Sequence, residues 1–254
     1  MKFMATADSD TGISKDTNQD SILVKHAAFD GGEVLMAVVC DGMGGLSKGE
    51  LASATVIRAF NKWFDQELPY ELVNPDMNVI GAKWSLLLKE LNVKILEYSK
   101  SISEDGMGTT FSGILFVGNQ YVIVHVGDSR IYYLGLTLEQ LTKDHTFIAR
   151  EIGNGTMTLE QAKTDKRRNL LLQCVGASKV VEPDILTGEI KKGVYLLCSD
   201  GFRHEITEDE IFESLNPINL MNKKAMHNNA KYLIEQVKSR EEKDNISVIL
   251  VKTE

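Results

Sequence analysis

Five aspartates lie at the ends of predicted β-strands, each beside a small or turn-forming residue. They occur in the segments VVCDG, YLLCSDG, VHVGDS, KDNISVILV and TNQDSILV, as Asp41, Asp200, Asp128, Asp244 and Asp20. One aspartate at a strand end is ordinary turn chemistry. Five are different, because strand ends on one edge of a sheet bring side chains together, and clustered carboxylates repel unless cations neutralise them. The pattern therefore indicates a cation site.

The chemistry of these ligands favours Mg²⁺ or Mn²⁺ over zinc, because they are hard oxygens without neighbouring Cys or His pairs. Gly42 follows Asp41 directly, and a residue without a side chain would let its backbone carbonyl approach an ion. Two such ions could clamp a phosphoryl oxygen and activate a water for in-line attack on phosphate. The residues thus predict metal-assisted phosphate hydrolysis.

Other phosphate-binding or phosphate-transferring motifs fit less well. Gly42, Gly44 and Ser47 approach a dinucleotide fingerprint, but an acid precedes the turn and no βαβ repeat follows. The segment GGLSKGE has Glu50 where a P-loop requires lysine. None of the cysteines is followed six positions later by the arginine that a cysteine phosphatase needs. The segment DSDTG (8–12) is similar to an aspartyl-phosphate motif, but the chain before it is too short for the required buried strand.

The overall composition is that of an ordinary globular protein, with 254 residues, 43% of them hydrophobic and 25% charged. The net charge of −8 argues against nucleic acid or an anionic membrane as the main partner. Cys40, Cys174 and Cys198 lack C-x-x-C spacing, so neither a disulfide framework nor a zinc site is expected, and Cys40 and Cys198 are expected to be buried. The N-terminus lacks the apolar core of a signal peptide, which leads us to expect a reduced, cytoplasmic protein.

Helices are predicted from apolar spacing and from capping patterns. Ser47 and Glu50 form a capping-box pattern, and helical spacing follows at Leu51, Ala54, Ile57, Phe60 and Trp63 or Phe64. A second helix is predicted over 78–100, with an apolar face of Ile80, Trp84, Leu87, Leu88, Leu91, Ile95 and Tyr98. A capping box at 207–210 predicts a short helix, and another helix is predicted over 223–239.

Strands are predicted from apolar runs and period-two patterns. The continuous run 33–40 predicts a strand buried on both faces. An antiparallel meander is predicted over 109–117, 120–126 and 130–135, and further strands over 193–198 and 245–251. Residues 144–180 lose this pattern and predict a surface insertion with a short helix over 158–163. The order favours an α+β fold with helices outside antiparallel sheets.

From residue 18 to the C-terminus, the chain resembles the bacterial form of the metal-dependent Ser/Thr protein phosphatases of type 2C. The resemblance rests on NQDS, VCDGMGG, GTTFSGILF, VHVGDSRIYYL, LTKDHT, LCSDGF and KDNISVILV, in the family's order. It implies one catalytic domain over 1–254, a four-layer αββα β-sandwich and a flap at about 145–180. It also implies hydrolysis of phosphoserine and phosphothreonine in proteins by attack of a metal-bound water at a binuclear Mn²⁺ or Mg²⁺ centre.

The resemblance also implies roles for single residues. Asp41 would bridge both ions, and the carbonyl of Gly42 would bind the second. Asp200 and Asp244 would bind the first ion, and Asp20 would act mainly through metal-bound water. Asp128 would hold a third, weaker ion together with Asp200. The implied partners are phosphorylated proteins, a Ser/Thr kinase and its targets among them, for a monomeric enzyme that needs neither nucleic acid nor membrane.

Three features depart from the family pattern. Lys15 stands where an arginine usually grips the substrate phosphate, and lysine keeps the charge but lacks the two-pronged fork. Met43 replaces the proposed general acid of many eukaryotic members, which leaves the acid unassigned. Asp165 and Lys166 replace a His-Pro pair in the flap.

Two questions stay open at the level of sequence. His145 has a structural interpretation, which we favour, and an interpretation as an acid. The alternative function is a catalytically weak or silent relative that binds phosphoproteins. Because the whole candidate ligand set is present, the sequence favours the enzyme.

Overall fold

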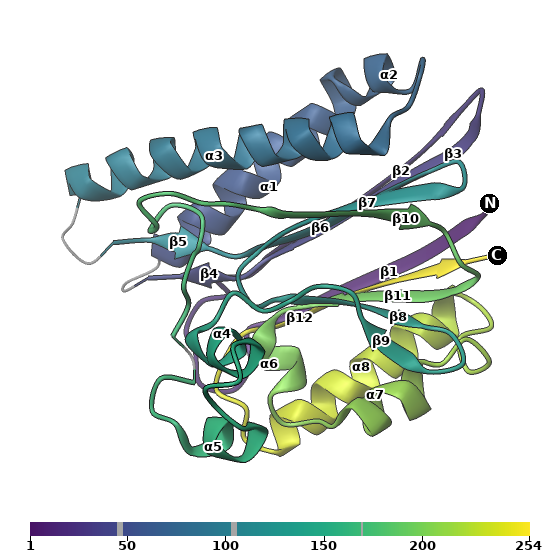
Figure 1. The fold of residues 1–254 in the computed structure, drawn as a ribbon. Coiled ribbons are helices and arrows are strands. Elements are labelled where there is room, and N and C mark those ends of the chain that lie inside the picture. Colours follow the sequence, from purple (N-terminus) through teal and green to yellow (C-terminus); the bar gives the residue numbers. More distant parts are fainter. Residues whose placement is uncertain (45–47, 103–105, 169) are drawn as a thin grey trace.

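The computed structural model describes residues 1–44, 48–102, 106–168 and 170–254, and two five-stranded antiparallel sheets pack face to face in it (Figure 1). The first sheet contains, in spatial order, β1 (Phe3–Asp10), β12 (Ile246–Thr253), β11 (Gly193–Cys198), β8 (Arg130–Leu134) and β9 (Leu138–Gln140). The second contains β10 (Asp184–Glu189), β7 (Gln120–Val126), β6 (Phe111–Val117), β3 (Gly32–Cys40) and β2 (Ser21–Phe29). A short pair, β4 (Gly42–Met43) and β5 (Gly108–Thr109), follows the end of β3.

Helices cover the outer faces of both sheets, which gives the layer order αββα (Figure 1). The second sheet carries α1 (Lys48–Gln66), α2 (Leu68–Glu71) and α3 (Met77–Ile102). The first carries α6 (Asp200–Arg203), α7 (Glu208–Leu215) and α8 (Lys223–Ser239). The predicted α+β sandwich flanked by helices is confirmed. In the described part of the chain, every helix is too short or too polar to span a bilayer.

The strand β3 is apolar along nearly its whole length because both of its faces are buried. Alternate side chains of a strand point to opposite faces, and both faces of β3 are buried. One face packs under the helices through Val34, Met36, Val38 and Cys40. The other face packs against the first sheet through Leu35, Ala37 and Val39. The prediction of a strand buried on both sides is confirmed.

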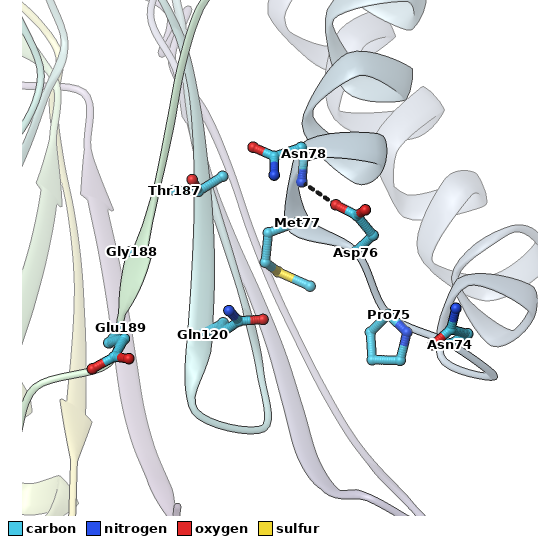
Figure 2. A pocket seen from close by; sticks show the side chains of 9 residues that line it. All are labelled: Asn74, Pro75, Asp76, Met77, Asn78, Gln120, Thr187, Gly188 and Glu189. Carbon is cyan, nitrogen blue, oxygen red and sulfur yellow. Dashed lines mark hydrogen bonds between the residues drawn. The ribbon is translucent and has the colours of Figure 1, made fainter.

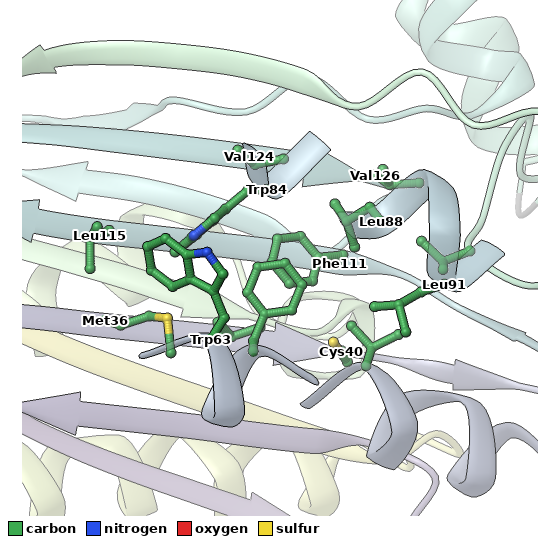
Figure 3. Packing of buried hydrophobic residues seen from close by; sticks show 14 of the residues in the cluster. Met36, Cys40, Trp63, Trp84, Leu88, Leu91, Phe111, Leu115, Val124 and Val126 are labelled. Atoms are coloured by element: carbon green, nitrogen blue, oxygen red, sulfur yellow. The ribbon is translucent and has the colours of Figure 1, made fainter. Parts of the chain in front are cut away.

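The core beneath α1 and α3 is built on aromatic side chains (Figure 3). The ring of Trp84 meets the rings of Trp63 and Phe60 edge-on, at centroid distances of 5.4 and 5.0 Å. Such edge-to-face pairs add to the stabilisation from burial alone. This core fixes α1 and the end of β3 relative to each other, and the candidate site lies where both meet.

The predicted helices occur, and most residues of their predicted apolar faces are buried. In α1 the buried side is formed by Ala52, Val56 and Phe60, whereas Leu51 is 38% exposed. The predicted stripe is therefore wrong at its first residue, whereas Phe60, Trp63 and Phe64 are buried as predicted. In α3, Tyr98 lies outside and Ser99 is buried instead. The predicted Ser47 cap lies outside the described residues.

The predicted meander is wrong in its third strand. The strands β6 and β7 pair as expected, but β8 crosses to the other sheet and pairs with β11 and β9. Three edge strands, β1, β9 and β10, were not predicted. The sequences of β1 and β10, FMATADSD and DILTGE, alternate only weakly, and β9 has only three residues. By contrast, β11, α7 with its Thr207–Glu210 capping box, α8 and β12 are confirmed. The insertion carries α4 (Phe147–Gly153) and α5 (Leu159–Thr164).

Candidate metal centre

All five predicted aspartates meet at one end of the sandwich. The register of β2 on β3 places Ser21 opposite Cys40, which brings Asp20 beside Asp41. The register of β11 on β12 places Cys198 opposite Val248, which brings Asp200 close to Asp244. Asp128 lies in the loop that crosses from β7 in one sheet to β8 in the other. The site thus takes residues from both sheets.

Backbone hydrogen bonds fix Asp41 and leave its carboxylate available. Its N–H donates to the Thr110 hydroxyl at 2.9 Å, and its C=O accepts from Thr110 N and Thr109 Oγ1 at 2.8 and 2.9 Å. The Thr110 hydroxyl in turn lies 2.7 Å from that of Ser129. The carboxylate therefore projects from a backbone that cannot shift freely.

Side-chain amides hold the loop that carries Asp20. The Asp20 N–H donates to Asn18 Oδ1 at 3.0 Å, and the Gln19 N–H donates to Asn245 Oδ1 at 2.9 Å. Asn245 Nδ2 donates to the Thr11 carbonyl at 2.9 Å. The residue next to Asp244 thereby anchors the segment before β2, and two distant parts of the chain are joined at the site.

Glycine is required at position 42 by two neighbouring backbones. A Cβ there would lie 2.4 Å from the carbonyl oxygens of both Gln19 and Gly49, a separation that real Cβ atoms do not adopt. The segment before β2 and the first turn of α1 can therefore approach β4 only because residue 42 has no side chain. The sequence analysis predicted that the Gly42 carbonyl approaches an ion. The structure adds that two other backbone segments, at Gln19 and Gly49, lie against Gly42.

The carboxylates are crowded, and burial disfavours their charge. The pKa of Asp41 lies well above its ordinary value because of burial first and then the charges of the other four aspartates. Burial also raises the pKa of Asp20 and of Asp128 to about 7, with the Asp200 charge acting on both. Two buried oxygens, Asp20 Oδ2 and Asp200 Oδ1, have no hydrogen-bond partner among the described residues.

Such a cluster fits divalent cations, since buried carboxylates need pairing or a metal to stay ionised. Across the described ranges, no three Asp, Glu, His or Cys side chains already form a finished ligand set for one ion. Asp244 instead forms an ion pair with Lys15, at 3.1 Å between Nζ and Oδ1. The donor set fits hard cations, and ligation would require side-chain adjustments.

Lys15 lies next to the acidic cluster. It lies in the loop between β1 and β2, and its side chain is 41% exposed. Burial lowers the pKa of Lys15, but the hydrogen bond and charge of Asp244 and the charges of nearby aspartates raise it above its ordinary value. A charged ammonium therefore stands at the open side of the cluster.

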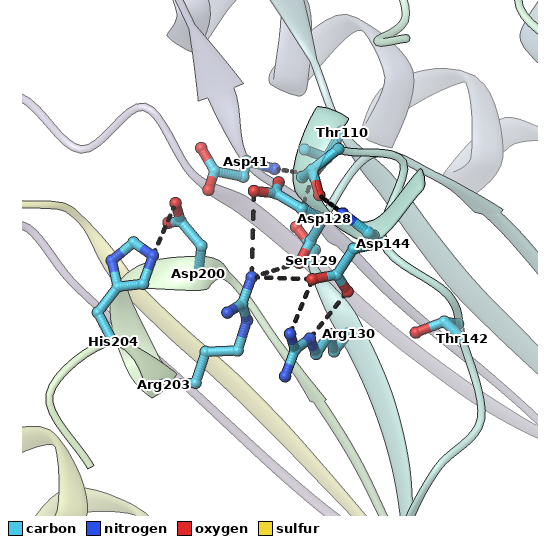
Figure 4. Close-up of polar contacts among 12 residues, drawn as sticks. Asp41, Thr110, Asp128, Ser129, Arg130, Thr142, Asp144, Asp200, Arg203 and His204 are labelled. Atoms are coloured by element: carbon cyan, nitrogen blue, oxygen red, sulfur yellow. Dashed lines mark hydrogen bonds and ion pairs between the residues drawn. The ribbon is translucent and has the colours of Figure 1, made fainter. Parts of the chain in front are cut away.

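The sequence analysis missed several charged residues around the aspartates (Figure 4). Arg203 donates to the Asp128 carbonyl at 2.9 Å and lies 3.7 Å from Asp144 Oδ2. Arg130 holds Asp144 with two hydrogen bonds of 2.8 and 2.7 Å. The signals were present, since Arg203 follows Asp200 by three residues in α6, and Asp144 lies in the quoted segment LTKDHT.

His204 connects two acidic side chains near the site. Its Nε2 lies 3.5 Å from Asp200 Oδ2, and its Nδ1 lies 3.4 Å from Glu242 Oε2. Buried Glu242 also accepts hydrogen bonds from the N–H groups of Lys243 and Asp244. Nothing in the strand-end pattern pointed to this pair, because His204 and Glu242 lie 38 residues apart and meet only in the fold.

His145 has the contacts of a structural histidine. Its Nδ1 accepts from Gly127 N at 3.2 Å and from Gln173 Nε2 at 2.8 Å, while Nε2 lies 3.1 Å from Asp184. The flap is thereby tied at its start to the residue before Asp128. Its other end is tied by the paired backbone hydrogen bonds of Val175 with Thr109. These contacts support the structural interpretation of His145.

Asp165, which stands with Lys166 where the family has a His-Pro pair, makes its contacts within the flap. The Asp165 carboxylate pairs with Arg167 at 2.8 Å, and the Arg167 guanidinium lies 4.0 Å from the centre of the Phe147 ring. These contacts are internal to the flap. They stabilise the flap internally, and no contact of the flap with a substrate follows from them.

A polar hollow of about 390 Å³ lies elsewhere in the molecule (Figure 2). It is lined by residues 74–78, Gln120 and residues 187–189, beside the start of α3. Its Asp76 caps that helix, accepting from Asn78 N at 2.8 Å. Because Gln120 begins β7 and the candidate centre follows the end of β7, the hollow is separate from the centre.

Comparison with known proteins agrees with this geometry. A family model described as Protein phosphatase 2C matches residues 13–238. The chain is 35% identical over 212 residues to the serine/threonine protein phosphatase PstP of Mycobacterium tuberculosis, covering 82% of this chain and 38% of that protein. It is 32% identical over 238 residues to the serine/threonine phosphatase stp of Listeria monocytogenes, covering 90% of this chain and 91% of that protein. The chain thus spans well under half the length of PstP and nearly all of stp.

Solved structures show the same fold. The serine/threonine phosphatase of S. agalactiae superposes with a TM-score of 0.86 at 26% identity, over 100% of both chains. The catalytic domain of PstP in complex with 2 manganese ions superposes with a TM-score of 0.77 at 30% identity, over 98% of this chain and 97% of that one. The chain therefore belongs to the protein phosphatase 2C family and resembles its bacterial serine/threonine phosphatases.

Proposed function

We propose that this chain is a metal-dependent phosphatase that hydrolyses phosphoserine and phosphothreonine in proteins, and that residues 1–254 form one catalytic domain. The observation that carries the proposal is the meeting of five aspartates at one edge, with buried oxygens on Asp20 and Asp200 that have no hydrogen-bond partner in the described part of the chain. Relatives named serine/threonine phosphatases and the manganese complex of PstP support it.

The ligand roles proposed here are those that the resemblance to the family implies. Asp41, at the end of β3, faces the charges of the other four aspartates and is the side chain best placed to be shared by two ions. Asp200 and Asp244 would hold the first ion, and the carbonyl of Gly42 the second. Asp20 would contribute mainly through water, and Asp128 stands at the side of the cluster next to Arg203.

Two divalent ions bound there would neutralise phosphoryl oxygens and lower the pKa of a water for in-line attack. The protein's own part is to hold the carboxylates rigidly, through the Thr110 and Asn245 hydrogen bonds. Lys15 offers a further positive charge to the phosphate dianion, because its ammonium is partly exposed beside Asp244. An acidic chain with a net charge of −8 needs such local cations to receive an anionic substrate.

The test is hydrolysis of one phosphothreonine peptide with Mn²⁺, with Mg²⁺ and after chelation. We expect activity with either ion and none in excess chelator. A suitable control variant is Asp30→Asn, since Asp30 is exposed at the turn between β2 and β3, far along these strands from Asp41. A protein that binds Mn²⁺ and phosphopeptide without turnover would instead be a silent phosphoprotein-binding module.

A further inference from the structure

The guanidinium of Arg203 lies inside the acidic cluster. Its Nη2 donates to the Asp128 carbonyl at 2.9 Å and lies 4.0 Å from Asp128 Oδ2 and 3.7 Å from Asp144 Oδ2 (Figure 4). The side chain is only 13% exposed. Its Nε is buried without a hydrogen-bond partner among the described residues. A desolvated arginine with an unused donor is costly unless its charge is needed there.

The charge is needed at Asp128. Asp144 already has its own cation, because Arg130 binds both of its carboxylate oxygens. Among the described residues, Asp128 has an ion pair with Arg203 alone, at 4.0 Å, and its side chain is only 12% exposed. Burial and the Asp200 charge raise the pKa of Asp128, and the Arg203 charge lowers it. Arg203 is thus the group that offsets the negative charge of this aspartate.

The position of Arg203 follows from the short helix α6. It begins at Asp200, and Arg203 is its last residue, so one helical turn carries both a candidate ligand and a cation. Residues three apart on a helix lie on the same side. The guanidinium is therefore delivered next to the candidate ligands by the element that also supplies Asp200.

We propose that the Arg203 guanidinium takes the place of a third metal ion at Asp128, so that the centre binds two divalent ions and not three. The proposal rests on the proposed function, because it presumes the two ions shared by Asp41. The resemblance implies a weaker ion held by Asp128 and Asp200, and such an ion would have to lie beside a fixed positive charge. A tethered cation needs no binding from solution, so the charge at Asp128 is independent of metal concentration.

The test counts bound Mn²⁺, by electron paramagnetic resonance of the free ion or by native mass spectrometry. Wild type should bind two ions. Arg203→Met, which keeps much of the side-chain length and removes the charge, should bind a third with at least tenfold higher affinity than wild type. Arg203→Lys is the matched control and should bind two. Adding Asp128→Asn to Arg203→Met should abolish the third ion.

A second measurement does not depend on the folding of the Arg203 variants. In the otherwise wild-type chain, Asp128→Asn should leave the Mn²⁺ stoichiometry at two. Loss of an ion on that substitution, or a folded Arg203→Met variant that still binds only two ions, would overturn the proposal. A wild-type protein that binds no Mn²⁺ would overturn the proposed function itself, which is a distinguishable result.

Discussion

Replacing Gly42 by alanine tests the packing on which the candidate centre depends. The added Cβ would lie 2.4 Å from the Gln19 and Gly49 carbonyl oxygens. Ordinary contacts begin near 3.4 Å, so each backbone must retreat by about 1 Å from a crowded junction. Neither neighbour is a flexible side chain that could rotate away.

The expected cost can be stated from this geometry. Overpacking a well-packed site costs about 1–3 kcal/mol, and two opposed backbone contacts place Gly42→Ala at the upper end, at about 3 kcal/mol. For a chain of this size, 1 kcal/mol corresponds to about 2–4 °C in Tm, so the melting temperature should fall by roughly 6–12 °C. Movement of Gln19 also displaces Asp20 relative to Asp41, so Mn²⁺ affinity should fall at least about tenfold, the equivalent of 1.4 kcal/mol.

The assay is thermal unfolding in chelator, followed by Mn²⁺ titration of the folded variant. Gly153→Ala is the matched control, because a Cβ there meets only the flexible end of Lys143, at 3.4 Å. It should melt within about 2 °C of wild type, as expected of surface substitutions. If Gly42→Ala melts like Gly153→Ala and binds Mn²⁺ normally, the role of the two backbones in requiring glycine is refuted.

Three further predictions concern the site and its surroundings. Asp41→Asn should lower the hydrolysis rate by several orders of magnitude with the fold intact, since it removes charge from both ion positions; normal turnover with two bound ions would refute this. Lys15→Ala should mainly raise KM for a phosphopeptide while Lys15→Arg preserves it, and an unchanged KM would remove Lys15 from the site. Burial lowers the pKa of His125 to about 4, below its ordinary 6.5, so the folded state binds fewer protons in this window. The contribution of His125 to the unfolding free energy should therefore fall by up to about 3 kcal/mol between pH 6.5 and 4, on top of the opposite contribution of the buried aspartates, which wild type and a His125 variant share. In denaturant unfolding, His125→Gln should lack this contribution, and a pH dependence equal to that of wild type would contradict the assignment.

The sequence by itself determined the elements whose pattern is local. The run 33–40 predicted a doubly buried strand, because a solvated face would expose valine, leucine or methionine side chains to water. The helix α8 was predicted with its observed limits, from helical periodicity that any packing partner must respect. The five aspartates were found for the same reason, since each ends or begins a strand visible in the letters around it.

What only the tertiary structure decided was which elements meet. The sequence of β8 is as apolar as that of β7, and nothing local says that it leaves the sheet of β7 to pair with β11. That crossing sets Asp128 between the two sheets and within reach of Arg203. The reason for Gly42 likewise lies in the backbones of Gln19 and Gly49. Periodicity records burial along one element, whereas contacts between distant residues depend on packing that the whole chain settles together.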